Sequence, residues 1–350
     1  MKILFNMAHS LRYYGGAEKW AISTMNGLTR LGHEVDGVYL SYVQDGIQRV
    51  DMDYVKKQLK CNYEEIGFKR GKFSPLQMAE LPDYGIYDVV YTTASYYSFL
   101  KQILKHSKTK NIFGFHDPAL QSDRLNFLQR RILNEVIPKF NVIHLQDESQ
   151  KKVFKHIDER FKVLQTWYVG NLPNLTNTPS YTRFTVLFTG RHETSKGIDT
   201  LIELSRKLPD DIDIIVTGTG NRSPDLRNSS HNMKVLGFVS DLQLSEIMLK
   251  SHTLLYPSYS ESTTSMTLND GLANGLPILF RPIPQNSELL GYKECIKCES
   301  VSDFINGILS LKEEWEKDSR AFLIRRQALQ NHLIQKGDYV KEFYDKILNS

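Results

Sequence analysis

The sequence contains few cysteines, no long hydrophobic run and no low-complexity segment. Its three cysteines are Cys61, Cys295 and Cys298 in 350 residues, whereas a secreted chain of this size more often carries an even, disulfide-forming set. No apolar stretch has the length of a membrane-spanning helix. At the start, MKILFNMAHS, Asn6 and His9 interrupt the apolar residues too early for a signal peptide. We therefore expect a cytoplasmic protein.

The sequence also lacks a convincing metal motif. Cys295 and Cys298 form a lone C-x-x-C, and a zinc site would need two further ligands, for which no second pair is present. A surface loop is the better interpretation of this motif. No Asp-x-Asp pair stands suitably at the end of an expected strand, so we predict no metal site.

What the sequence does contain is typical of a soluble globular protein with two domains. Hydrophobic residues make up 41% and charged residues 24% of the chain, and 350 residues exceed what one core usually supports. The net charge is +4, but residues 1–170 carry 24 Lys and Arg against 18 Asp and Glu. Basic clusters at 54–60, 68–72 and 101–110 fit peripheral contact with an anionic inner membrane surface or an anionic acceptor. The alternative for each cluster is a solvated helix face.

Apolar runs of strand length alternate with helical patterns along most of the chain. KILFNM, a loop, the amphipathic AEKWAISTMNGLTRL and then EVDGVYL form a strand–helix–strand start. A region rich in Asn, Pro and Thr at 170–183 interrupts the alternation, which restarts with FTVLFTGR. We predict an α/β fold with two Rossmann-like, doubly wound parallel sheets facing each other across a cleft. The domains would span 1–170 and 171–330, and a C-terminal helix at 331–350 would pack back on the first domain.

Ligands of open α/β sheets bind beyond the carboxyl ends of the strands, and several polar motifs occur there. After FTVLFTG, the segment GRHETSKG places Arg191 and Lys196 beside a turn that opens a helix at Gly197. Two cations at such a turn suit a phosphate group. Two solvated surface cations are an equally good interpretation.

After HTLLYPS, the sequence ESTTSMTLNDGLANGLP has more polar groups than a helix start needs. Glu261 would lie in the loop, the hydroxyl-rich run would begin a helix whose free N–H groups bind phosphate, and Asp270 could hold the hydroxyls of a ribose. Each acid could equally be a helix cap or a solvated residue. The hydroxyl-rich run consists of Ser262, Thr263, Thr264 and Ser265.

Two further motifs are weaker. Gly15 and Gly16 precede a helix start and would let the backbone approach a ligand closely. His116 and Asp117 follow NIFGF, where a histidine could donate to a sugar hydroxyl or a phosphate. A structural histidine is the competing interpretation.

Taken in order, these motifs resemble the retaining, nucleotide-sugar-dependent family-4 glycosyltransferases of the GT-B fold. The resemblance covers nearly the whole chain: GGAE with GHEV, the HD pair, GRxxxxKG, GFV at 237–239, and PSxxE leading to a helix that ends AxGxP. It implies that Arg191 and Lys196 neutralise the donor diphosphate. Glu261 would contact the donor sugar, and Asp270 the nucleotide ribose. Gly15 and Gly16 would approach the phosphates, and His116 would lie at the sugar.

The sequence departs from the family pattern at the acidic pair. The usual E-x7-E spacing is E-x8-D here, so that an alignment from GLANGLP places Ser262 rather than Glu261 at the first acid. We expect a one-residue bulge at the helix start. The phenylalanine–glycine pair usual after the first acid is also missing.

The resemblance implies a metal-independent hexosyltransferase with no cofactor beyond its nucleotide-diphosphate sugar donor. A uridine-diphosphate sugar is favoured, with guanosine-diphosphate mannose next, and the acceptor would be a glycan or a lipid-linked molecule, as in cell-surface polysaccharide synthesis. No nucleic-acid motif is present. The alternatives are a nucleotide-sugar epimerase of the same architecture and a catalytically inactive glycan-binding or scaffold protein, which the altered acid spacing would favour.

Overall fold

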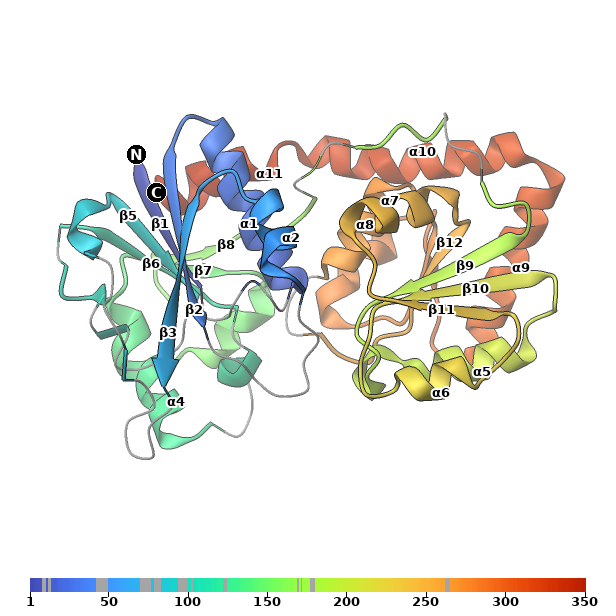
Figure 1. Ribbon diagram of the computed structural model, residues 1–350, viewed down its shortest axis with the longest axis horizontal. Coiled ribbons are helices and arrows are strands. Elements are labelled where there is room, and N and C mark those ends of the chain that lie inside the picture. Colours follow the sequence, from blue (N-terminus) through green and yellow to red (C-terminus); the bar gives the residue numbers. More distant parts are fainter. Residues whose placement is uncertain are drawn as a thin grey trace. The chain divides into compact units, whose positions relative to one another are not determined.

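The chain forms two compact units in the computed structural model (Figure 1). The N-terminal unit comprises residues 1–169 and 338–350, and the C-terminal unit comprises 170–337. The structure describes residues 1–7, 11, 14–41, 50–69, 77–78, 83–93, 100–101, 103–106, 108–116, 118–121, 125–168, 170, 172–176, 180–261 and 265–350.

The N-terminal unit is built on an eight-stranded sheet. Its strands are β1 (Lys2–Met7), β2 (Glu34–Ser41), β3 (Asn62–Lys69), β4 (Gln77–Met78), β5 (Val89–Thr92), β6 (Lys110–Gly114), β7 (Val142–Leu145) and β8 (Phe161–Val163). They lie in the order β4-β3-β2-β1-β5-β6-β7-β8, and every pair is parallel except β3 with β4. The order reverses between β1 and β5, which is where open sheets of this kind bind ligands.

Mostly short helices cover this sheet, together with the longer α1. They are α1 (Gly16–Arg30), α2 (Met52–Gln58), α4 (Phe127–Arg131), α11 (Tyr339–Phe343), the 3-10 helices η2 (Tyr84–Ile86), η3 (Pro118–Gln121), η5 (Ile137–Lys139) and η6 (Glu148–Val153), and the π-helices η4 (Ile132–Val136) and η9 (Tyr344–Leu348). Helix α1 begins where the Glu18 carboxylate accepts the Gly15 N–H at 2.8 Å. Its buried face, which includes Trp20 and Met25, follows the helical repeat.

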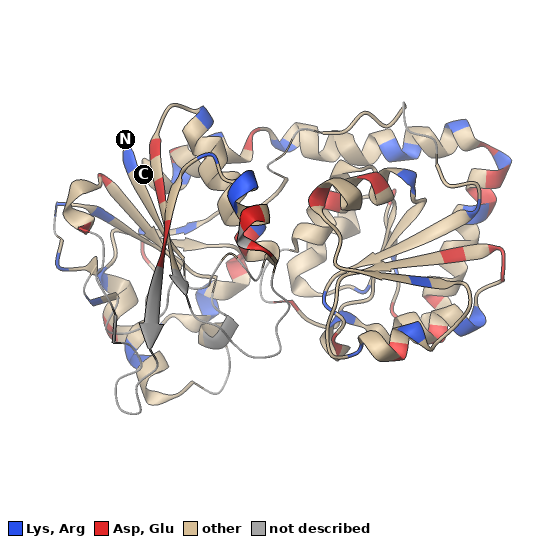
Figure 2. Cartoon of the chain, in the orientation of Figure 1, with Lys and Arg blue, Asp and Glu red and all other residues tan. Residues whose placement is uncertain are grey.

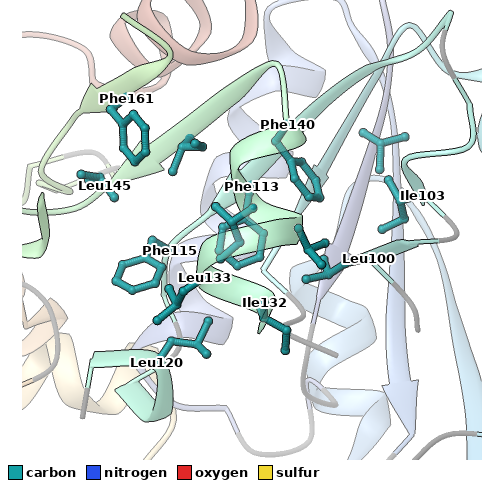
Figure 3. Packing of buried hydrophobic residues seen from close by; sticks show 14 of the residues in the cluster. Leu100, Ile103, Phe113, Phe115, Leu120, Ile132, Leu133, Phe140, Leu145 and Phe161 are labelled. Atoms are coloured by element: carbon teal, nitrogen blue, oxygen red, sulfur yellow. The ribbon is translucent and has the colours of Figure 1, made fainter. Parts of the chain in front are cut away.

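One buried cluster of the N-terminal unit packs the short helices against the sheet, and most of its strand residues come from β5–β8 (Figure 3). Phe113 and Phe115 lie on either side of Gly114, the last residue of β6, and both are fully buried. Ring contacts join Phe113 to Phe140 at 5.5 Å and Phe115 to Phe154 at 5.1 Å between centroids. The strand that leads to His116 is therefore anchored firmly in the core.

The C-terminal unit has a six-stranded sheet in which all pairs are parallel. Its strands are β9 (Phe184–Thr189), β10 (Ile212–Thr217), β11 (Met233–Gly237), β12 (Thr253–Tyr256), β13 (Ile278–Phe280) and β14 (Ile296–Lys297), in the order β11-β10-β9-β12-β13-β14. The order reverses between β9 and β12. Strand β9 is buried almost throughout, as a continuous apolar run predicts for a parallel sheet covered on both faces.

The helices of this unit are longer and more regular. They are α5 (Ile198–Lys207), α6 (Ser223–Arg227), α7 (Asp241–Lys250), α8 (Met266–Ala273), α9 (Val301–Lys317) and α10 (Ser319–Lys336), with the 3-10 helices η7 (Thr194–Lys196) and η8 (Pro284–Gly291). The helices of both units carry basic and acidic positions, and most strand positions are uncharged (Figure 2).

The surface-loop interpretation of the C-x-x-C motif is wrong. Cys295 and Cys298 flank β14, and Cys298 is fully buried in the core of the C-terminal unit. Burial raises the pKa of both thiols to about 12, because the thiolate is poorly solvated there. Cys298 behaves as a small hydrophobic residue of the core, and Cys295 is half-buried beside it.

Candidate active site

The polar segment after β9 folds into a tight turn against the end of β12. Gly197 has φ of +77° and precedes α5, and a Cβ on it would lie 2.4 Å from the carbonyl oxygen of Pro257. Only glycine tolerates both the left-handed backbone and this close approach. The Tyr259 N–H donates to the Ser195 carbonyl at 2.8 Å, which fastens the two loops together. The turn thus brings GRHETSKG beside the loop that carries Glu261.

Lys196, Glu261 and Tyr256 form a polar cluster at this junction. The Lys196 ammonium is paired with one Glu261 carboxylate oxygen, and the Tyr256 hydroxyl donates to the other at 2.6 Å. The side chains of Lys196 and Glu261 are only 15% and 10% exposed. Burial, and then the adjacent Glu261 carboxylate, raise the pKa of Tyr256 well above its usual range, so the phenol stays a donor. An enclosed, paired cation and carboxylate therefore stand at the point where the strand order reverses.

The two cations predicted to act together are in different surroundings. The Arg191 side chain is 69% exposed and pairs with Glu193 at 3.0 Å, whereas Lys196 is enclosed and pairs with Glu261. Among the described contacts none joins Arg191 to Lys196. Arg191 is consequently a solvent-facing cation at the rim of the turn, and an exposed pair such as this one contributes little to stability.

Helix α8 begins where the sequence predicts, beside the enclosed pair. Ser265 is its N-cap residue but its side chain makes no capping bond, while Ser262, Thr263 and Thr264 lie outside the described residues. Asp270 is partly exposed in the helix, and its carbonyl oxygen accepts from Asn274. Gly275 follows the helix with a left-handed φ of +63°. A Cβ on it would lie 2.6 Å from the Arg326 carbonyl oxygen.

Sequence reasoning missed the glycines that follow β10. A Cβ on Gly218 would lie 2.0 Å from the Gly190 carbonyl oxygen, and one on Gly220 would lie 2.5 Å from that of His192. The loops after β9 and β10 are therefore packed backbone against backbone beside the cluster. The run TGTG at 217–220, directly after an apolar strand, was the available signal.

Sequence reasoning also missed Arg222. Its guanidinium binds Asp199 at 2.7 Å, is paired with Asp225, and donates to Thr194 Oγ1 at 3.1 Å. These bonds use all three nitrogen atoms of the guanidinium group. Arg222 thus ties α5, α6 and η7 together in this structure.

In the N-terminal unit, His116 follows β6 and stands against α1. Its ring lies 4.5 Å from the Trp20 ring between centroids, and its Nε2 is 2.9 Å from the Tyr91 hydroxyl. Burial, with a smaller contribution from His144, lowers the pKa of His116 to about 3, so the ring is neutral at physiological pH. Trp20 connects His116 to the helix that opens at Gly15 and Gly16. Asp117 lies outside the described residues.

The structure also bears on metal binding and on membrane spans, for the residues that it describes. Within this part of the chain no three His, Cys, Asp or Glu side chains are grouped so that they could hold a metal ion. Across the same ranges, none of the helices has the length and apolar character needed to cross a bilayer.

The two parallel-sheet domains have the GT-B fold of glycosyltransferases. The chain is similar to Anabaena HepE, solved with UDP and glucose, with a TM-score of 0.70 and 16% identity over 97% of this chain and 96% of that chain. It is similar to S. aureus TarM, a mutant of which was solved with fondaparinux, α-GlcNAc-glycerol and UDP, with a TM-score of 0.76 and 11% identity over 100% of both chains. WaaG, a glycosyltransferase involved in lipopolysaccharide biosynthesis, gives a TM-score of 0.65 and 14% identity over 100% of both chains.

At the level of sequence, residues 177–326 match the family model described as glycosyl transferases group 1. The matched segment contains Arg191, Lys196, Glu261 and Asp270. Curated proteins gave no match to the sequence.

Proposed function

We propose that the protein is a retaining glycosyltransferase. It would move a hexose-type sugar from a nucleotide-diphosphate sugar, with UDP favoured, to a hydroxyl of a glycan or lipid-linked acceptor. The observation that carries this proposal is the enclosed cluster of Lys196, Glu261 and Tyr256. The cluster lies where the strand order of the C-terminal sheet reverses, within the segment that matches glycosyl transferases group 1. The UDP complexes of HepE and TarM support the choice of nucleotide.

The cluster suggests how a donor would be held. In the structure Glu261 neutralises Lys196, so an arriving diphosphate would compete for the ammonium while a sugar hydroxyl takes the freed carboxylate oxygen. Tyr256 would keep the carboxylate in place during this exchange. Arg191, being exposed, is free to turn from Glu193 toward the phosphates.

The remaining roles follow the family resemblance. Asp270 would bind the ribose, the N–H groups near Ser265 and the Gly15–Gly16 backbone would face phosphate, and His116 would contact the sugar. Charge gathers on the leaving diphosphate as the glycosidic bond breaks. Cationic and N–H donors already in position would stabilise that charge without a metal ion, which is where the largest rate contribution is expected.

Thermal unfolding in the presence of nucleotides tests the donor site. We expect one nucleoside diphosphate from a panel with different bases to raise the melting temperature, and Arg191→Ala to reduce the shift. The matched control is Arg206→Ala, which removes an exposed arginine from the last turn of α5, the end of the helix remote from Gly197. An equal shift in melting temperature in both variants would show that Arg191 does not bind the diphosphate. No shift with any nucleotide would favour the scaffold alternative.

Turnover separates the transferase from its alternatives. Glu261→Gln keeps the hydrogen bond to Tyr256 but removes the charge, so sugar transfer should fall by roughly 100-fold or more if the carboxylate acts on the donor sugar. A scaffold would show no transfer in the parent protein, and an epimerase would convert the free nucleotide sugar without an acceptor. Full transfer activity in Glu261→Gln would refute the role given to Glu261.

We further propose peripheral contact of the N-terminal unit with an anionic membrane surface, consistent with a cytoplasmic location. Phe127 is 72% and Leu128 is 42% exposed on α4, next to Arg130 and Arg131. Apolar side chains flanked by arginines suit the interface of an anionic bilayer. The test is flotation with phosphatidylglycerol-containing vesicles. Phe127→Ser should weaken it, high salt should reverse it, and Ile324→Ser, which removes an exposed apolar residue from α10, should leave it unchanged.

A further inference from the structure

His116 is the end of a chain of hydrogen bonds that reaches across β5, β6 and β7. Tyr91 lies on β5 and His144 on β7, and β6 runs between them with Gly114 opposite His144 in register. A Cβ on Gly114 would lie 2.2 Å from the Tyr91 hydroxyl oxygen and 2.9 Å from the His116 ring. The glycine therefore leaves the space in which Tyr91 reaches both histidines.

The hydrogen bonds assign the protons on both rings. His144 Nε2 lies 3.0 Å from the carbonyl oxygen of Leu164, which accepts only, so Nε2 of His144 carries the proton and Nδ1 is an acceptor. The Tyr91 hydroxyl must then donate to His144 Nδ1, at 2.7 Å. Its oxygen is left to accept from His116 Nε2–H, at 2.9 Å.

Gln146 completes this pattern. In the structure the Gln146 amide nitrogen lies 3.3 Å from His116 Nε2 and 3.4 Å from His144 Nε2, and the amide oxygen accepts from Thr166 Oγ1 at 2.7 Å. Because both imidazole Nε2 atoms carry a proton, the amide oxygen rather than its nitrogen must face them, and a half-turn of the amide achieves this while its nitrogen donates to Thr166 Oγ1. Each imidazole N–H of the chain then has an acceptor.

The opposite face of His116 is fixed by packing. The Trp20 ring packs against it, tilted by 37° with 4.5 Å between centroids, and Trp20 Nε1 donates to the Tyr339 hydroxyl at 2.8 Å. Tyr339 is 1% exposed and lies on α11, so the C-terminal segment holds Trp20 in place. His116 thus has little freedom to rotate or to change its tautomer.

We propose that Tyr91 and His144 are positioning residues that hold His116 as the neutral Nε2–H tautomer and leave Nδ1 as its acceptor for a sugar hydroxyl. The inference rests on the proposed transferase function, because it gives His116 a substrate. The tautomer itself is independent of that function. A neutral imidazole with its proton on Nε2 has its only lone pair in the ring plane at Nδ1.

The test is nitrogen NMR on the full chain with ¹⁵N-labelled histidine at pH 7.5, with the His116 signals assigned by their loss in His116→Gln. We expect the Nε2–H tautomer in the parent protein and a mixture with Nδ1–H in Tyr91→Phe. In the same variant kcat should fall by about 10- to 100-fold, as it does when an outer partner of a metal-binding histidine is lost, while KM for the donor changes by less than about twofold.

Tyr84→Phe is the matched control, because Tyr84 is also a buried tyrosine of this unit and its hydroxyl accepts from Asn6. It should leave the tautomer and kcat unchanged. An Nδ1–H tautomer in the parent protein, or an unchanged tautomer and kcat in Tyr91→Phe, would overturn the inference. Absence of turnover with every donor would refute the transferase function instead, and the tautomer alone would then decide the role of Tyr91.

Discussion

At the scale of single residues, the turn at Gly197 shows what a sequence motif leaves open. The motif GRxxxxKG predicted a turn at the end of a strand, because glycine and charged residues follow an apolar run. It did not predict that Lys196 pairs with Glu261, since these residues are 65 positions apart and meet only through the folding of two loops. The close approaches of Gly190, Gly218 and Gly220 were hidden for the same reason.

Gly197→Ala should destabilise the C-terminal unit. An alanine there would adopt a left-handed backbone, and its Cβ would meet the Pro257 carbonyl oxygen, which belongs to the backbone and cannot turn aside. We expect the free energy of unfolding to fall by about 2–4 kcal/mol in urea titrations. Gly291→Ala is the control, because a Cβ there has no neighbour within 4 Å, and its effect should stay within about 0.5 kcal/mol. Equal effects of the two substitutions would contradict the tight turn.

At the scale of elements, the strand–helix alternation was predictable and its exceptions were not. Buried parallel strands such as β9 and β12 are nearly continuous apolar runs, which a sequence displays openly. Segment 148–153 has a helical pattern but forms only the 3-10 helix η6, because tertiary context overrides weak local propensity. Cys298 was expected in a surface loop and is a core residue, because burial is decided by neighbouring strands and helices.

The contact between α1 and α11 gives a prediction for two elements. A Cβ on Gly27 would lie 2.5 Å from Val340 Cγ2. Gly27→Ala should therefore stabilise α1 by about 1 kcal/mol through helix propensity and destabilise the contact by about 1–3 kcal/mol through overpacking. Adding Val340→Ala should relieve the overpacking. A double-mutant cycle in urea should therefore show a favourable coupling of about 0.5–3 kcal/mol. Strict additivity of the two substitutions would mean that the residues 338–350 do not pack on α1 in solution.

At the scale of the whole molecule, buried neutral histidines should set the acid sensitivity of the fold. Burial lowers the pKa of His116 to about 3 and those of His144 and His252 to about 4. The unfolded chain binds protons on these residues below a pKa of about 6.5, whereas the folded protein does not until far lower pH. Stability is therefore fully present above about pH 7 and is lost as the pH falls toward 4.

The window from pH 7 to pH 5 isolates this effect. Carboxylates with lowered pKa values, such as Asp199 and Asp303, lose their contribution only nearer their unfolded pKa of about 4, so histidines dominate above pH 5. Each buried histidine should cost about 1–2 kcal/mol of unfolding free energy across this window. Urea unfolding at the two pH values should show a smaller loss in His144→Gln than in the parent chain. His231→Gln removes a side chain that is 75% exposed and should leave the loss unchanged. The same loss in all three proteins would mean that His144 is accessible to protons in the folded state, and the hydrogen-bond chain that ends at His116 would then be open to solvent.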